Sequence, residues 1–348
     1  MSKKRAWLRP PINDISLSIV TDPLPIGKYK ITEAIKSQLR KGLNLIKNSF
    51  NPAPSYLLSK YRGHPAVTRS IVEGLQKIKI LSNYNPTELN QLSQSVVVVS
   101  GISALKQMIL LKQQGYIKCL IAGPNILNDV SSERDILSAP EIDRYITHAP
   151  VCSLIKRIVP ALSSRCVAWA SGVDCDYWTP DLTLKRDQIL IYSKQNKGPT
   201  DSLDKYAQWL IAKGYEVSYV NYGSYSPEDY KNLLQKACLM IGFSRDESQG
   251  IAWAEAWACD VPTLFRKHNE SVYLGVQYDG SVAPYLTEQT GRYFQDLNSF
   301  INIFEKWELN DFFFKPRQWC LDNMSDEVCS QNLLEILDTV KNPYLEFQ

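Results

Sequence analysis

The chain has 348 residues, of which 44% are hydrophobic and 22% are charged, and its formal net charge is +3. These values exclude an intrinsically disordered chain and predict a soluble globular protein with room for two domains. No apolar run approaches the roughly 20 residues that span a bilayer, and no apolar signal segment follows the basic start MSKKR, so we expect a cytoplasmic protein.

Positive charge is concentrated near the N-terminus. Residues 1–80 contain 15 Lys and Arg against 4 Asp and Glu, a net charge of +11 that leaves −8 on the rest of the chain. An apolar stripe predicts a helix over residues 32–47, and Lys36, Arg40 and Lys47 form a basic ridge on it. The bias predicts an anionic partner, either a membrane surface or a phosphorylated acceptor. The ridge has an alternative explanation as the solvated face of a helix packed on the core.

Other partner classes find little support in the sequence. A net charge of +3 and the absence of a recognition motif argue against nucleic acid. The eight cysteines show no CxxC spacing and there are only three histidines, so no zinc cluster is indicated. Buried thiols in a reducing compartment explain the cysteines better than a disulfide framework.

Apolar runs of strand length alternate with helical patterns in the first half of the chain. The expected strands are residues 15–20, 78–81, 96–100, 119–122, 145–147 and 167–170. The expected helices are residues 66–76, 102–114 and 152–162. This alternation predicts a doubly wound α/β domain, which binds ligands beyond the carboxyl ends of its strands. Residues 100–101, 123–125 and 147–148 are therefore expected along one edge, facing a possible cleft.

The same alternation continues in the second half. The expected strands are residues 189–192, 216–220, 239–243, 263–265 and 290–294, and the expected helices are residues 203–213, 227–236, 249–258 and 297–307. An apolar-periodic helix over residues 326–340 ends the pattern. The sequence therefore predicts a second α/β domain followed by a C-terminal helix.

A helix in the second half contains a carboxylate where burial is expected. Nearly all positions of residues 249–258 are Ala, Ile or Trp, yet Glu255 lies in the middle. An unpaired carboxylate there would be costly, so Glu255 needs a partner. The alternative is an ordinary buried helix with Glu255 bonded to backbone.

The start of this helix predicts an anion site. Backbone N–H groups of Gln249, Gly250 and Ile251 have no partner inside the helix and point outward with the positive end of its dipole. Gly250 has no Cβ, so a ligand could approach the backbone closely. Glu247 and Glu255 lie on either side of this start. The arrangement predicts a ligand with a central diphosphate and hydroxyl groups at both ends.

The stretch FSRDESQGIAWAEAWACDVPTL, residues 243–264, carries a family resemblance. Seven residues separate Glu247 from Glu255, and the runs SQG, EAWA and PT fall at matching offsets. The pattern resembles the donor-site signature of the retaining, nucleotide-sugar-dependent glycosyltransferases of GT-B fold, group 1 or family 4-like. The resemblance implies two Rossmann-like domains facing a cleft, a C-terminal helix that crosses back, and a role in polysaccharide or glycoconjugate biosynthesis.

The resemblance also assigns roles to residues. Glu255 would hold the ribose of a nucleotide sugar and Glu247 would lie near the donor sugar. The diphosphate would be received by the helix start, which comprises Ser248, Gln249, Gly250 and Ile251. The nucleotide sugar is a co-substrate, and no metal or other cofactor is expected.

Further basic and glycine residues have weaker matches. The family places an Arg and a Lys after the first strand of the second domain, where this chain has Lys194 and Lys197 with a shorter gap. Both could instead be plain loop charges. Gly63 corresponds to a family glycine turn near the donor phosphates. His148 ends a strand at the cleft edge and is a candidate acceptor-side catalytic residue, with a purely structural histidine as the alternative.

The resemblance also divides the chain. We expect an acceptor-side domain over residues 1–175, a donor domain over residues 176–322, and a C-terminal helix in residues 323–348 that packs on the first domain. Asp174 and Asp176 could instead form the metal-binding aspartate pair of GT-A glycosyltransferases, but a second set of strands and helices follows them. Hexosyltransferase-like activity is expected, with an epimerase of the same fold or a non-catalytic binding protein as alternatives.

Overall fold

The computed structural model describes residues 17–22, 60–126, 134–194, 203–267, 271–273, 276–278 and 280–341. The expected helix at residues 32–47, with Lys36, Arg40 and Lys47, lies outside the described residues, and so does Lys197. The basic ridge and its anionic partner therefore stay predictions.

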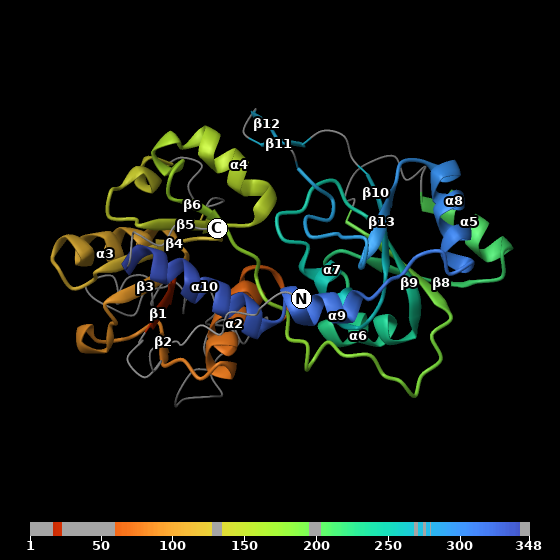
Figure 1. Ribbon diagram of the computed structural model, residues 1–348, viewed down its shortest axis with the longest axis horizontal. Coiled ribbons are helices and arrows are strands. Elements are labelled where there is room, and N and C mark those ends of the chain that lie inside the picture. The colour runs from red at the N-terminus through yellow and green to blue at the C-terminus, as the bar shows by residue number, and fades with distance from the viewer. Residues whose placement is uncertain are drawn as a thin grey trace, which may run out of the picture.

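A six-stranded parallel sheet forms the N-terminal half (Figure 1). Its order is β2-β1-β3-β4-β5-β6, with β1 (Leu17–Thr21), β2 (Ser82–Tyr84), β3 (Ser95–Ser100), β4 (Cys119–Ala122), β5 (Arg144–Thr147) and β6 (Cys166–Ala168). Helices α2 (Gly63–Lys77), α3 (Ile102–Gln113) and α4 (Ala149–Ile158) connect them, with the short 3-10 helices η3 (Leu89–Gln91), η5 (Arg134–Ser138) and η6 (Pro160–Leu162). Alternate valines of β3 enter different cores, Val96 and Val98 one and Val97 and Val99 the other, as expected for a sheet covered on both faces.

A five-stranded parallel sheet forms the second half, in the order β13-β10-β9-β7-β8. Its strands are β7 (Gln188–Ser193), β8 (Glu216–Asn221), β9 (Ala237–Phe243), β10 (Thr263–Arg266) and β13 (Gly291–Phe294). Its helices are α5 (Leu203–Ala212), α6 (Pro227–Lys236), α7 (Ile251–Ala258), α8 (Leu297–Glu308) and α9 (Pro316–Asn323). Strands β11 (Ser271–Tyr273) and β12 (Val276–Tyr278) form a separate antiparallel pair. The two expected α/β units are both present.

The C-terminal helix α10 (Asp326–Lys341) returns to the N-terminal half and lies against α2 (Figure 1). Arg69 of α2 donates two hydrogen bonds to Asp326, at 2.6 and 2.9 Å. The segment that leads from the first sheet to the second lies beside the segment that leads back into α10. Val173 N–H donates to the Met324 carbonyl, and Asp326 N–H donates to the Val173 carbonyl. The predicted boundary at residues 175–176 falls in this connection, between the end of β6 and the start of β7.

One predicted strand is wrong. Residues 78–81 form the turn that ends α2, where Ile80 N–H donates to the Leu75 carbonyl and Lys79 has φ +60°. Strand β2 follows at Ser82. The apolar run 78–81 misled the prediction because Ile80 is buried at the end of a helix rather than within a sheet.

The expected helix at residues 152–162 is divided in two. Helix α4 begins earlier, at Ala149, and ends at Ile158, and η6 begins at Pro160. Pro160 has no backbone N–H to continue the helical hydrogen bonds. The short elements α9, β11 and β12 were not predicted.

Candidate active site

The sheet order places the site. In the second sheet β7 lies between β8 and β9, so the strand order reverses there, and ligands of open α/β sheets bind at such points. Lys194 follows β7, and Glu247 lies in the turn after β9. A cavity of about 500 Å³ opens here, and its opposite wall comes from the first half of the chain. That volume lies within the usual range of small-molecule sites.

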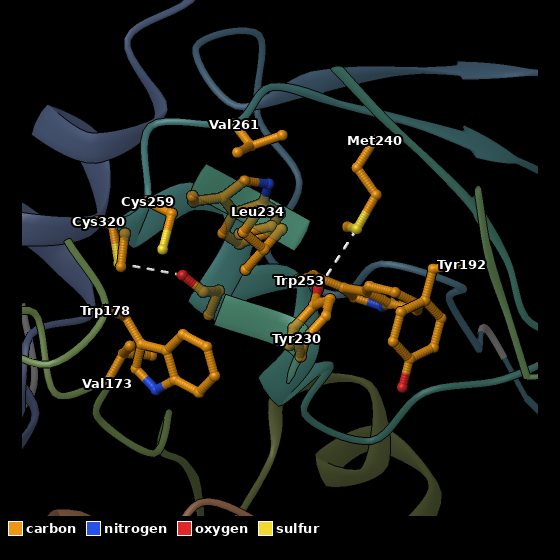
Figure 2. Packing of buried hydrophobic residues seen from close by; sticks show 14 of the residues in the cluster. Val173, Trp178, Tyr192, Tyr230, Leu234, Met240, Trp253, Cys259, Val261 and Cys320 are labelled. Atoms are coloured by element: carbon orange, nitrogen blue, oxygen red, sulfur yellow. Dashed lines mark hydrogen bonds between the residues drawn. The ribbon is translucent and has the colours of Figure 1, made fainter. Parts of the chain in front are cut away.

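The first residues of helix α7 line the cavity. Apolar side chains pack against this helix, among them Trp178, Tyr192 and Tyr230 (Figure 2). Its N-cap is Gly250, with φ +69° and ψ +47°. A Cβ at this position would lie 2.3 Å from Cδ1 of Trp253, so the close approach and the left-handed backbone both require glycine. The helix begins at Ile251, two residues later than predicted.

The start of α7 presents free donors to the cavity. No described residue accepts a hydrogen bond from the backbone N–H of Gly250, Ile251 or Ala252. All three residues line the cavity. Free N–H groups at the positive end of a helix dipole are what the sequence analysis expected of an anion site, and anion binding there stays a prediction.

Glu255 lines the same cavity with only 4% of its surface exposed. Within the part of the chain that the structure describes, its carboxyl has neither a hydrogen-bond nor an ion-pair partner. Burial raises the pKa of Glu255 well above its usual range, against a smaller lowering by Arg69. The alternative of a carboxyl bonded to backbone is therefore wrong. Glu255 is therefore open to a partner from outside the described chain.

Glu247, in contrast, is fully paired. Its carboxylate accepts hydrogen bonds from Lys194 Nζ and from Ser244 Oγ, both at 2.8 Å. Its backbone N–H donates to the Ser281 carbonyl. The Lys194 ammonium also lies 4.6 Å from the centre of the Tyr222 ring. Lys194 therefore lines the cavity as the ion-pair partner of Glu247 rather than as a free cation.

The predicted turn residues Ser248 and Gln249 differ in their surroundings. Ser248 is exposed at the cavity rim. The Gln249 side chain is buried and bridges Ser171, donating to its carbonyl at 3.0 Å and accepting from its N–H at 3.2 Å. Gln249 thus fixes the connection between the two halves, and its side-chain amide is already engaged.

The opposite wall contains Gly63 and His148. Gly63 is the first residue of α2 and has φ +51°. His148 is the N-cap of α4, and its burial lowers its pKa to about 4, against a hydrogen bond to the Trp169 backbone that raises it. His148 Nδ1 and Asn125 Nδ2 are both buried without a partner in the described chain. His148 and Asn125 thus contribute two unpaired polar atoms to this wall.

Sequence reasoning missed several cavity residues. Arg62 lines the cavity, and its position next to Gly63 in the sequence could have identified it as a site residue. Asn125 was placed at the cleft edge but not among the site residues. Tyr222 and Tyr225 come from the loop after β8, and no local pattern distinguishes them from other loop tyrosines. The expected edge residues Ser100 and Gly101 do not line the cavity.

Asp174 and Asp176 do not surround an open site. Lys77 Nζ lies 3.2 Å from Asp174 Oδ1 and 2.8 Å from Asp176 Oδ2, and Asp174 also accepts a hydrogen bond from the Tyr61 hydroxyl. Their role in the connection is therefore structural. Across the described residues, no group of three or more His, Cys, Asp or Glu side chains is arranged to hold a metal ion.

Two more general features are the state of the cysteines and the apolar character of the helices. All eight cysteines are free thiols, and seven of them are buried, in agreement with the sequence-based prediction. None of the helices in the described ranges combines the length and the apolar character needed to cross a membrane.

Comparison with known proteins shows the fold. No protein-family model and no curated protein sequence matches the chain. Among solved structures, AviGT4, a glycosyltransferase involved in avilamycin A biosynthesis, is similar with a TM-score of 0.50 at 10% identity, over 94% of this chain and 98% of that chain. Alr3699/HepE of Anabaena, in complex with UDP, is similar with the same TM-score and identity, over 93% of this chain and 100% of that one. The predicted GT-B architecture is confirmed.

Proposed function

We propose that the chain is a glycosyltransferase that binds a nucleotide sugar in the cavity and transfers its sugar to an acceptor. The observation that carries the proposal is Glu255, a buried carboxyl that faces the cavity without a protein partner. The hydroxyl groups of a ribose are donors that would satisfy it. The GT-B fold shared with AviGT4 and the free N–H groups of α7 support the same conclusion.

The cavity walls suggest how the donor lies. With the ribose on Glu255, the diphosphate reaches the N–H groups of Gly250, Ile251 and Ala252. The sugar then lies between Glu247 and the wall that contains His148 and Asn125. The unpaired Nδ1 and Nδ2 atoms of that wall suit hydroxyl groups, because a neutral imidazole and an amide can each accept or donate without a charge.

The proposed chemistry depends on stabilising the leaving nucleoside diphosphate. Backbone donors fixed at a helix start provide this without reorganisation, which is electrostatic preorganisation. We therefore propose metal-independent transfer of a hexose with retention of configuration, as the family resemblance implies. In this arrangement Lys194 orients Glu247 beside the sugar.

Incubation with a panel of UDP-, GDP-, ADP-, CDP- and dTDP-sugars tests the proposal. UDP-sugars come first, since HepE was crystallised with UDP. We expect one donor to release its nucleoside diphosphate, faster when a mixture of candidate acceptor sugars is added, and EDTA to leave the rate unchanged. A new sugar isomer without release would indicate an epimerase. Binding without either product would identify a non-catalytic protein, and EDTA inhibition reversed by manganese would contradict metal independence.

A further inference from the structure

Among the described residues that line the cavity, positive and negative charges do not balance. Lys194 and Glu247 neutralise each other in an ion pair, and burial raises the pKa of Glu255 well above its usual range, which favours its neutral form. Arg62 also lines the cavity, with its side chain exposed. No described carboxylate forms an ion pair with it. The positive charge of Arg62 contributes to lowering the pKa of Asp229. The Asp229 carboxylate, however, already accepts a hydrogen bond from Ser226 in the capping box at the start of α6.

Arg62 reaches across the cavity. It is the N-cap of α2 and so belongs to the first half of the chain. Its guanidinium lies 5.4 Å from the centre of the Tyr225 ring, which comes from the loop after β8 in the second half. A guanidinium stacked on an aromatic face is weakly held and keeps its N–H groups available for another partner.

A chain of contacts connects Tyr225 to the anion site. The Tyr225 and Tyr192 hydroxyls are hydrogen-bonded at 2.7 Å. The Tyr192 ring packs edge-on against Trp253 in the first turn of α7, with 4.8 Å between ring centres. The aromatic platform under Arg62 is therefore fixed to the helix whose start carries the free N–H groups.

We propose that Arg62 binds the diphosphate of the nucleotide from the first half of the chain, with Tyr225 as the platform that positions it. The inference rests on the proposed function, because it assigns a ligand to the same cavity. A guanidinium can bind phosphate oxygens with two parallel hydrogen bonds, which a lysine cannot reproduce. The diphosphate is then held by α7 on one side and by Arg62 on the other. Arg62 thereby supplies the cation that Lys194, paired with Glu247, does not supply freely.

Calorimetry of nucleotide binding tests this role. The nucleoside diphosphate that binds wild type most tightly is chosen from UDP, GDP, ADP, CDP and dTDP, and its nucleoside monophosphate and nucleoside are measured beside it. We expect Arg62→Gln to weaken diphosphate binding about 10- to 100-fold, the range of a charge-assisted hydrogen bond, and to leave nucleoside binding unchanged. Arg62→Lys should lose part of the affinity. The loss should shrink at high salt, because the side chain is exposed.

Arg157→Gln is the matched control. Arg157 is an exposed arginine of α4 that does not line the cavity, so the same charge is removed elsewhere in the same half of the chain. We expect no change in affinity for this variant. An equal loss in both variants would reveal a general charge effect and overturn the assignment.

The platform is tested by Tyr225→Leu alone and combined with Arg62→Gln. We expect Tyr225→Leu to weaken diphosphate binding several-fold in the wild-type background and to add little to Arg62→Gln, because contacting residues are not additive. Tyr225→Phe, which keeps the ring, should bind like wild type. Additive losses in the double variant would contradict the platform.

Three further results would overturn the inference, and they distinguish its failure from the failure of the proposed function. If Arg62→Gln binds the diphosphate like wild type, Arg62 has no such role, although the proposed function stands. If nucleoside binding falls equally, Arg62 contacts the base or ribose rather than the diphosphate. If wild type binds none of the five nucleoside diphosphates, the proposed function fails and the inference fails with it.

Discussion

Two regions of the molecule bury polar side chains, and they differ in whether those side chains have partners within the protein. Between α2 and α10, Arg69 and Asp326 are both almost fully buried, and their opposite charges pair through two hydrogen bonds, although Arg69 Nε has no partner in the described chain. Around the cavity, Glu255, His148 and Asn125 are buried to a similar degree, but each has at least one polar atom without a protein partner. Because unpaired burial is costly, the first arrangement is expected of a structural contact and the second of a ligand site.

The difference predicts opposite responses to substitution. Removing one member of a satisfied pair leaves a buried charge behind and destabilises the fold. Removing an unsatisfied group relieves a cost in the absence of ligand and harms only binding. Substitution between α2 and α10 should therefore lower stability without lowering ligand affinity. Substitution at the cavity should lower ligand affinity without lowering stability.

The largest effect is expected at the α2–α10 contact. Arg69→Ala should lower the free energy of unfolding by about 3–5 kcal/mol, because Asp326 would stay buried without a countercharge. Urea unfolding followed by circular dichroism measures it. The double variant Arg69→Met, Asp326→Leu should recover much of the loss, since both charges are then removed. A loss below about 1 kcal/mol in the single variant would contradict the distinction.

The second effect is the pH dependence from His148. Its folded-state pKa of about 4 lies below the ordinary 6.5, so the neutral imidazole stabilises the fold above pH 6.5 and this stability is lost as pH falls towards 4. The difference amounts to about 3 kcal/mol. His148→Gln should flatten the free energy of unfolding between pH 6.5 and 4. His64→Gln, at an exposed cavity position, should make the slope only slightly shallower, because His64 contributes least to the lowered pKa of His148.

The smallest effect on stability is expected at Glu255. Its folded-state pKa is raised, so its contribution to stability is fully present below the ordinary pKa of 4.5 and is lost as pH rises above it towards the folded-state pKa. At pH 8, Glu255→Gln should therefore stabilise the ligand-free protein by about 1–2 kcal/mol, while nucleotide-sugar affinity falls about 10- to 100-fold. Thermal unfolding and calorimetry measure the two changes.

Glu247→Gln is the matched control for Glu255. The same substitution there removes the partner of Lys194 and Ser244, so the ligand-free protein should lose stability instead of gaining it. If both variants shift stability in the same direction, the paired and unpaired carboxyls do not differ as proposed.

Local sequence patterns determined most strands of the two sheets and the start of α7. Apolar residues at strand and helix spacing mark surfaces that must be buried, and this depends on neighbours a few positions apart. The pattern located nearly all elements of the second sheet, and Gly250 at the helix start, from this information alone. It failed at residues 78–81, where burial of Ile80 at a helix end is indistinguishable from a short strand.

The state of each polar side chain was decided only by tertiary structure. Glu247 and Glu255 look alike in the sequence, but Lys194, 53 residues away, pairs with one of them and no described residue pairs with the other. Gln249 is engaged by Ser171, 78 residues away. Arg62 meets Tyr225 only because the two halves face each other. Pairing, burial and pKa depend on groups that the fold brings together from distant parts of the sequence. The spacing of residues along the chain does not predict the distances between such groups.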